Sequence, residues 1–261
     1  VSCLLIKQCN FCVVGLQKLF NMDTWQVPTD PTTEIAVDPK EYIALAEKDL
    51  NSLSALCLAE TMLFLFPEYF VIIWNIMRER VHLVRDFSKL AIGIPRGFAK
   101  TTLMKIWVVY CVLFTTKKCI IVCSHNVDHA INIILDVTSM LSHPNVERLF
   151  GDWRINLERD QATCKIFSFR GRKVIIGAIG AKGNIRGLNI GNSRPDIIIF
   201  EDFQDRKESE SDIISTALYK EMLGTFMMAA SPFGCMYIFV ANMYPTTGSI
   251  LKKLEENPDW I

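Results

Sequence analysis

The sequence lacks an excess of charge of either sign, because its 28 lysines and arginines balance its 28 aspartates and glutamates. A balanced chain has no global basic field that recruits nucleic acid, so any such contact has to be local or transient. The sequence also lacks internal repeats and low-complexity segments, which excludes repeat architectures. With 50% hydrophobic residues over 261 positions, the chain is long enough for one large or two modest domains with a buried core.

Long apolar runs are missing as well. Residues 1–20 are fairly apolar, but polar side chains interrupt them too often for a membrane span or a secretory leader. We therefore expect no membrane contact. The nine cysteines are an odd number and several lie inside apolar runs, which favours reduced thiols in the cytoplasm over a disulfide framework.

The pattern of apolar residues predicts helices first and then an alternation of strands and helices. Prolines among threonines and aspartates indicate a linker over residues 21–37. Asp38 is predicted to cap a helix whose apolar face continues to Cys57, and a second helix is predicted after Pro67, over residues 68–85. Further on, we expect strands at 90–94, 118–123, 196–200 and 236–240, helices at 100–114, 126–141 and 208–223, and a hairpin of strands 164–169 and 173–178. This order predicts an α/β fold with a mainly parallel central sheet flanked by helices, with residues 1–60 as a helical N-terminal extension or lid and 61–261 as the main domain.

A glycine-containing turn between the first strand and its helix has the chemistry of a phosphate-binding loop. Small residues let backbone N–H groups close around a polyphosphate, and the helix N-terminus adds further donors and a positive dipole end. In this interpretation Lys100 reaches the β- and γ-phosphates of ATP and the Thr101 hydroxyl holds Mg²⁺. The predicted nucleotide-binding residues are Pro95, Arg96, Gly97, Phe98, Ala99, Lys100, Thr101 and Thr102.

Two adjacent carboxylates, Glu201 and Asp202, follow the apolar strand that begins near Asp196. Acids at the end of a hydrophobic strand are favourable at the carboxyl edge of an open α/β sheet, where ligands bind. We expect Glu201 to hold Mg²⁺ through water and Asp202 to position or deprotonate the attacking water. A helix-capping pair is the competing interpretation of the same residues.

Taken together, three motifs resemble the ATPase domain of the large terminase subunit, the DNA-packaging motor of tailed bacteriophages and herpesviruses. They are the loop from Pro95 to Thr102, the segment around Arg186, and the run from Arg194 to Asp202. The resemblance covers about residues 66–254 and implies a P-loop NTPase fold. Family members usually end the acidic strand with Asp-Glu or Asp-Asp, whereas Glu-Asp stands here, so which carboxylate is the base stays open.

The same resemblance implies roles for further residues. Arg96 would approach the γ-phosphate, Arg186 would serve this subunit or a neighbour as an arginine finger, and Asn242 would sense the phosphate state. The aromatic run at residues 66–70 lies where relatives bind adenine, although a core cluster fits the same residues. The implied partners are double-stranded DNA, a portal protein and a small terminase subunit, with a homo-oligomeric ring on the procapsid in the host cytoplasm.

Several alternatives stay open. His125 and His129 are spaced for a zinc site on one helix face, but no third ligand is evident nearby. The basic hairpin tip of Arg170, Arg172 and Lys173 is a hypothetical DNA contact. The family's C-terminal nuclease has no counterpart within residues 1–261, so we expect this fragment to hydrolyse ATP without cutting DNA. A helicase-like DNA-dependent ATPase and a non-hydrolysing nucleotide-binding assembly module are the two other functions that the motifs allow.

Overall fold

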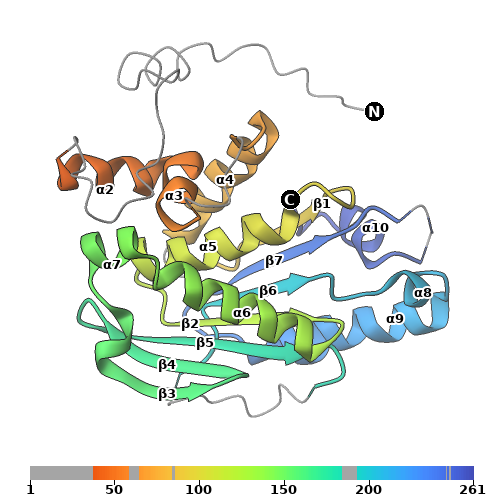
Figure 1. Ribbon diagram of the computed structural model, residues 1–261. Coiled ribbons are helices and arrows are strands. Elements are labelled where there is room, and N and C mark those ends of the chain that lie inside the picture. The colour runs from red at the N-terminus through yellow and green to blue at the C-terminus, as the bar shows by residue number, and fades with distance from the viewer. Residues whose placement is uncertain (1–37, 59–64, 84–85, 184–192, 245, 247) are drawn as a thin grey trace. The chain divides into compact units, whose positions relative to one another are not determined.

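The computed structural model describes residues 38–261 except 59–64, 84–85, 184–192, 245 and 247 (Figure 1). A seven-stranded sheet runs through this part of the chain, with the strand order β1-β7-β6-β2-β5-β4-β3. The strands are β1 (Lys89–Gly93), β2 (Cys119–Ser124), β3 (Leu157–Gln161), β4 (Cys164–Phe169), β5 (Arg172–Gly180), β6 (Ile197–Glu201) and β7 (Met236–Ala241). The predicted linker at residues 21–37 lies outside the described residues.

Five neighbouring strands, from β1 to β5 in the sheet order, are parallel, and β4 and β3 add an antiparallel edge. The central strands β2, β6 and β7 are buried along their whole length. This burial explains their sequences, because a parallel strand covered on both faces is almost continuously apolar. β7 lies between β1 and β6, so one strand separates the predicted phosphate-loop strand from the acidic strand.

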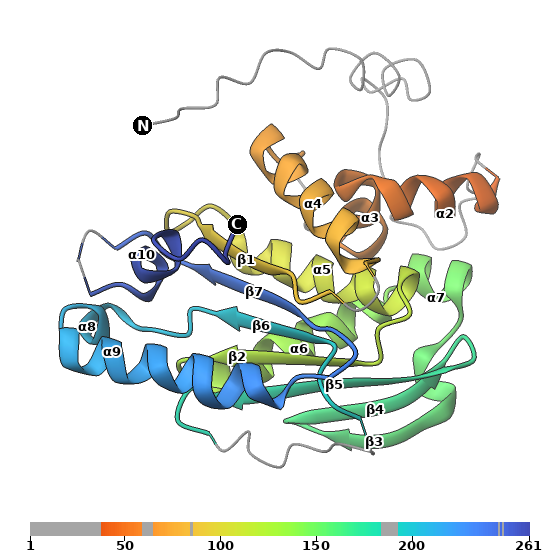
Figure 2. The ribbon, with the colours of Figure 1, turned by 180° about the vertical axis from the view of Figure 1, so that it is seen from behind.

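Helices cover both faces of the sheet. Figure 1 shows α5 and α6 on one face, and Figure 2 shows α8 and α9 on the other. The helices are α2 (Pro39–Lys48), α3 (Leu50–Cys57), α4 (Glu68–Val81), α5 (Lys100–Phe114), α6 (Val127–Leu141), α7 (Pro144–Phe150), α8 (Arg206–Ser209), α9 (Asp212–Glu221) and α10 (Ile250–Glu255), with short helical turns η1 (Trp153–Asn156), η2 (Met222–Phe226) and η3 (Met227–Ala229).

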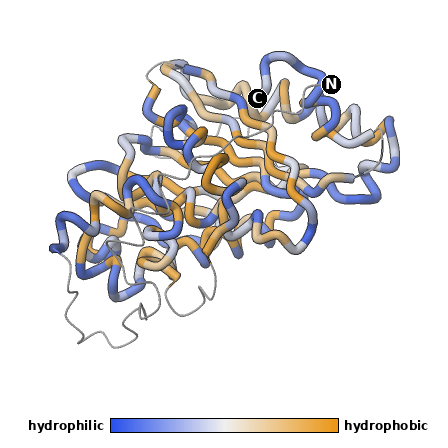
Figure 3. The backbone as a smooth tube through the Cα atoms, turned by 90° about the horizontal axis from the view of Figure 1, so that it is seen from above, coloured by the Kyte–Doolittle hydropathy of each residue, from blue (hydrophilic) through white to orange (hydrophobic). Residues whose placement is uncertain are grey.

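Two hydrophobic clusters lie on opposite faces of the sheet, because successive side chains of a strand point to opposite sides. Val122 and Ile199 join the cluster that includes α2 to α7, whereas Ile121 and Phe200 join the cluster that includes α9, η2 and α10. The tube coloured by hydropathy shows the apolar strands inside and hydrophilic segments at the periphery (Figure 3). The helices before β1 therefore share a core with the sheet.

Most predicted elements are confirmed, and the differences have local causes. The helix at 100–114 has the predicted bounds. The predicted N-terminal helix is interrupted, because Asp49 adopts an extended conformation and its side chain caps α3 through the Ser52 N–H. The predicted helix at 208–223 is divided in the same way, because Ser211 caps α9. In total, α7, β3 and the helical turns were not predicted.

The arginines of the hairpin tip contact the C-terminal end of α5. Arg170 and Gly171 have positive φ angles, as a two-residue hairpin turn requires. Arg172 donates to the carbonyl oxygens of Cys111, Val112 and Lys117. The Arg170 guanidinium donates to the Leu113 carbonyl and lies 5.5 Å from the Phe150 ring centre. Both side chains thus satisfy backbone groups at a helix C-terminus, which accounts for them without a nucleic-acid ligand.

The aromatic run at residues 66–70 is divided between the core and the surface. Phe70 is 1% exposed and packs edge-on against Phe66 at 5.4 Å, while Tyr69 is 40% exposed. The core interpretation of this run therefore holds for Phe70. Of the helices that the structure describes, none has both the length and the apolar character needed to cross a bilayer.

Candidate functional site

Four parallel strands end side by side at the carboxyl edge of the sheet. β1 ends at Gly93, β7 at Ala241, β6 at Glu201 and β2 at Ser124. The segments that follow them therefore meet at this edge, where ligands of open α/β sheets bind. The Ile94 N–H donates to the Ala241 carbonyl at 3.1 Å, so the loop after β1 starts against β7.

Residues 95–99 form an exposed turn between β1 and α5. Gly97 has a φ angle of 88°, which glycine adopts without steric cost. Ala99 has a φ angle of 54° and stands at the N-cap of α5, where it offers no side-chain hydrogen bond. The first N–H groups of this helix therefore have no side-chain cap, which is the arrangement that accepts an anion.

Lys100 begins α5 and turns its ammonium group toward Asp202. Its Nζ lies 2.7 Å from Asp202 Oδ2, and the two side chains are 11% and 27% exposed. Asn242, directly after β7, donates from Nδ2 to Asp202 Oδ1 at 3.2 Å. The sheet edge thus brings together three predicted site residues that lie far apart in the sequence.

Glu201 is fully buried and accepts a hydrogen bond on each carboxylate oxygen. The Thr101 hydroxyl donates to Oε1 at 2.5 Å, and His129 Nε2 lies 2.6 Å from Oε2. An ionised carboxylate can only accept, so Nε2 is the donor. The predicted metal ligands Thr101 and Glu201 are therefore in direct contact, and His129 joins them from the first turn of α6.

The two carboxylates have opposite pKa shifts. Burial alone would raise the pKa of Glu201, but the hydrogen bonds from His129 and Thr101 outweigh it, and the pKa lies below its ordinary value. The pKa of Asp202 is raised by its own burial and by the charge of Glu201, in spite of Lys100. The hydrogen bond to Glu201 raises the pKa of His129.

The backbone holds Asp202 in an uncommon conformation, with a φ angle of 44°. Its N–H donates to the Val240 carbonyl at 3.0 Å, and its carbonyl accepts from the His125 N–H at 3.1 Å. These bonds tie Asp202 to β7 on one side and to the segment after β2 on the other. Strained backbone of this kind persists where the surrounding structure fixes it, and it is frequent at functional sites.

These groups fit a magnesium nucleotide. Mg²⁺ takes oxygen ligands and binds proteins through one or two carboxylates together with substrate phosphates, and the Thr101 hydroxyl and the Glu201 carboxylate offer oxygens of this kind. The turn at residues 95–99 and the uncapped N-terminus of α5 supply N–H donors for phosphate. A positively charged lysine stands between these two sets of groups.

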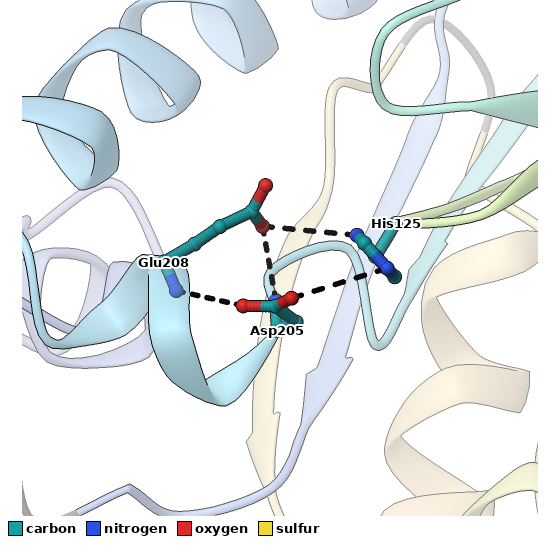
Figure 4. Close-up of side chains that lie close together, drawn as sticks. All are labelled: His125, Asp205 and Glu208. Carbon is teal, nitrogen blue, oxygen red and sulfur yellow. Dashed lines mark hydrogen bonds and ion pairs between the residues drawn. The ribbon is translucent and has the colours of Figure 1, made fainter.

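The histidines at positions 125 and 129 contact different acids. His125 lies 3.8 Å from Glu208 Oε2 and 4.0 Å from Asp205 Oδ2 (Figure 4). Asp205 and Glu208 also cap α8 through each other's backbone N–H groups, at 2.7 and 3.1 Å. The two rings therefore belong to separate groups of potential ligands and do not form the zinc pair that their spacing allowed.

The remaining predicted residues are placed as follows. Pro95, Arg96 and Phe98 are exposed in the turn, and Thr102 is half-buried in the first turn of α5. The fully buried apolar face of this helix begins at Leu103. Arg186 lies outside the described residues.

His129 is the site residue that the sequence did not reveal. Its spacing from His125 drew attention to zinc, whereas its actual partner lies 72 positions further along the chain. The contact depends on β2 being the sheet neighbour of β6, which the sequence does not specify. No protein-family model matches the chain, and no curated protein matches it, so the residues of the site themselves carry the case for a function.

Proposed function

We propose that this chain is a P-loop ATPase that hydrolyses ATP with Mg²⁺, and that it powers the movement of double-stranded DNA. The observation that carries the proposal is the contact of Lys100 with Asp202 at 2.7 Å and of Thr101 with Glu201 at 2.5 Å. The first residues of each pair open α5, while Glu201 ends β6 and Asp202 directly follows it. A strand, an exposed glycine turn and a helix that starts with Lys-Thr supply the phosphate side. A buried strand that ends in two acids supplies the metal and water side.

In this proposal Lys100 turns from Asp202 to the β- and γ-phosphates, and the N–H groups at the start of α5 bind the same oxygens. Thr101 and Glu201 hold the magnesium ion, which neutralises charge on the phosphates when bound. Asp202 orients and deprotonates the attacking water, for which its raised pKa suits it. Asn242 holds Asp202 in place through the 3.2 Å hydrogen bond and responds when that carboxylate moves.

Two arginines complete the proposed reaction. Arg96 is exposed in the turn and free to approach the γ-phosphate. Arg186 is proposed as an arginine finger, because a planar guanidinium can span two phosphate oxygens. Such fingers accelerate hydrolysis by about 10³–10⁵-fold. If Arg186 acts in a neighbouring subunit, mixing Arg186→Ala and Lys100→Ala proteins restores part of the activity that each lacks alone.

The work on DNA rests on the resemblance of the motifs to large terminase subunits. By that resemblance the proposed partners are double-stranded DNA, a portal protein, a small terminase subunit and further copies of this chain in a ring. The proposed place of action is the host cytoplasm, at the procapsid. Nuclease activity is not expected from residues 1–261.

The test is ATP turnover of the purified chain, with and without duplex DNA, at rising protein concentration. We expect turnover that increases more steeply than protein concentration, that DNA stimulates, and that Lys100→Ala abolishes. Turnover that survives Lys100→Ala, or the double change Glu201→Gln and Asp202→Asn, would refute the assignment of the site. ATP binding without turnover at any concentration would favour the assembly module instead, and strand separation would favour a helicase.

A further inference from the structure

A carboxylate with no exposed surface stands at the centre of the site, and two side chains hold it. Thr101 occupies Oε1 of Glu201, and His129 occupies Oε2. If the Thr101 hydroxyl becomes a metal ligand, its hold on the carboxylate changes with each catalytic cycle. The hydrogen bond from His129 lies on the other oxygen and does not depend on that exchange.

We propose that His129 is a positioning residue, which keeps the Glu201 carboxylate oriented toward Thr101 so that the two can share one magnesium ion. The inference rests on the proposed function, and it assigns a role that neither the phosphate loop nor the acidic strand supplies. Residues behind metal ligands orient those ligands, and their mutation commonly weakens metal affinity or activity by about 10–100-fold. The Nε2–Oε2 distance of 2.6 Å is that of a charge-assisted hydrogen bond.

A purely structural role does not account for this histidine. Its side chain is 42% exposed, so its replacement opens no cavity in the core. It lies in the first turn of α6, which Asn126 already caps through the Asp128 N–H at 3.0 Å. The polar partner of His129 Nε2 is therefore Glu201, and the hydrogen bond orients the carboxylate rather than stabilising the start of the helix.

The experiment uses two amides of different reach. In His129→Gln the amide nitrogen stands as many bonds from Cβ as Nε2 does, so it can still donate to Glu201. In His129→Asn it stands one bond closer to the backbone and cannot reach. The matched control is His125→Gln and His125→Asn, four residues earlier, on a ring that faces Asp205 and Glu208 instead.

Two readouts are taken for every variant: the Mg²⁺ concentration that gives half-maximal ATP turnover, and the rise in melting temperature that MgCl₂ produces without nucleotide. We expect His129→Asn to need about tenfold more Mg²⁺ and to lose most of the thermal response, as for other residues behind a metal ligand. The Mg²⁺ concentration that His129→Gln needs for half-maximal turnover should stay within about threefold of that of the unaltered chain, because the hydrogen-bond donor is kept. Both His125 variants are expected to match the unaltered chain.

Equal Mg²⁺ dependence of the two His129 variants would overturn the inference, as would an unfolded His129→Asn. A switch in preference between Mn²⁺ and Mg²⁺ that only His129 variants show would also overturn it, because it would make the imidazole a metal ligand. The proposed function is judged separately. Suppose that the unaltered chain shows no ATP turnover, but MgCl₂ raises the melting temperature of His129→Gln and not that of His129→Asn. In that case the proposed function fails while the positioning role stands.

Discussion

Replacing Asp202 by asparagine should make the protein bind ATP more tightly while it loses the ability to hydrolyse it. Lys100 is paired with Asp202 at 2.7 Å, and the proposed reaction needs the same ammonium group on the phosphates. Binding therefore has to break the pair. Asparagine removes the charge but tolerates the positive φ of this position and keeps the Oδ1 that accepts from Asn242.

The expected size follows from the burial of the pair. A fully buried pair costs about 3–5 kcal/mol to break and an exposed one contributes about 0–1 kcal/mol. Lys100 is nearly buried and Asp202 is 27% exposed, so we take about 2 kcal/mol as the value between those limits. In Asp202→Asn that energy no longer opposes ATP binding, so the affinity of the variant for ATP should rise by roughly 10–30-fold. The nucleotide-free variant should also melt about 4–8 °C lower, because Lys100 loses its partner.

The assays are calorimetric titration with a non-hydrolysable ATP analogue and melting curves with and without it. The analogue should narrow the difference in melting temperature between Asp202→Asn and the unaltered chain, because phosphate replaces the missing carboxylate. Asp205→Asn is the matched control: it removes the same charge three residues away, and asparagine caps α8 as well as aspartate does. Unchanged or weaker binding by Asp202→Asn, or equal gains in both variants, would refute the idea that nucleotide displaces this ion pair.

Three further predictions concern stability, pH and the thiols. Arg172→Leu should lower the free energy of unfolding by about 2–4 kcal/mol in chemical denaturation, because it removes charge-assisted donors from buried carbonyls. Lys173→Leu breaks an exposed ion pair and should lower the same free energy by under about 1 kcal/mol. Equal losses in the two variants would contradict the role of Arg172 at the end of α5. ATP turnover should fall with decreasing pH as Asp202 is protonated, at a pH above the ordinary aspartate pKa of about 3.9, because that pKa is raised; a kcat–pH profile that is flat down to the ordinary value would contradict this. The six cysteines that the structure describes are buried, and burial raises the pKa of each thiol, so peptide mapping after brief alkylation should find them unlabelled until the protein unfolds.

The parts of the fold that the sequence predicted are those whose residues repeat a local signal. The buried parallel strands are apolar along their whole length, and α5 has both a turn before it and an apolar pattern through it. β3 carries no such signal, because it is an edge strand whose residues after Leu157 are exposed and polar. The break at Asp49 was missed because the apolar spacing continues across it, and only the capping bond to Ser52 shows the interruption.

The candidate site divides in the same way. Glu201 and Asp202 could be predicted because they stand at the end of an apolar strand, and Lys100 and Thr101 because they open the helix after a glycine turn. Parallel strands share one edge, so the two pairs were expected to meet there. The partner of each side chain could not be predicted, because that depends on the order of strands in the sheet. With β7 between β1 and β6, Asn242 reaches Asp202, and with β2 beside β6, His129 reaches Glu201.

Those partners bear on the question that the sequence left open, namely which of the two acids is the base. Glu201 has both oxygens occupied, no exposed surface and a lowered pKa, so it is a poor proton acceptor and a well-fixed ligand. Asp202 keeps 27% of its side chain exposed and has a raised pKa, and in the proposed reaction it would lose its ion pair when Lys100 turns to phosphate. A base needs access to water and a pKa closer to the working pH, and only the second carboxylate meets both conditions. The inverted order of the two acids is therefore compatible with the metal being held by the first and water being activated by the second.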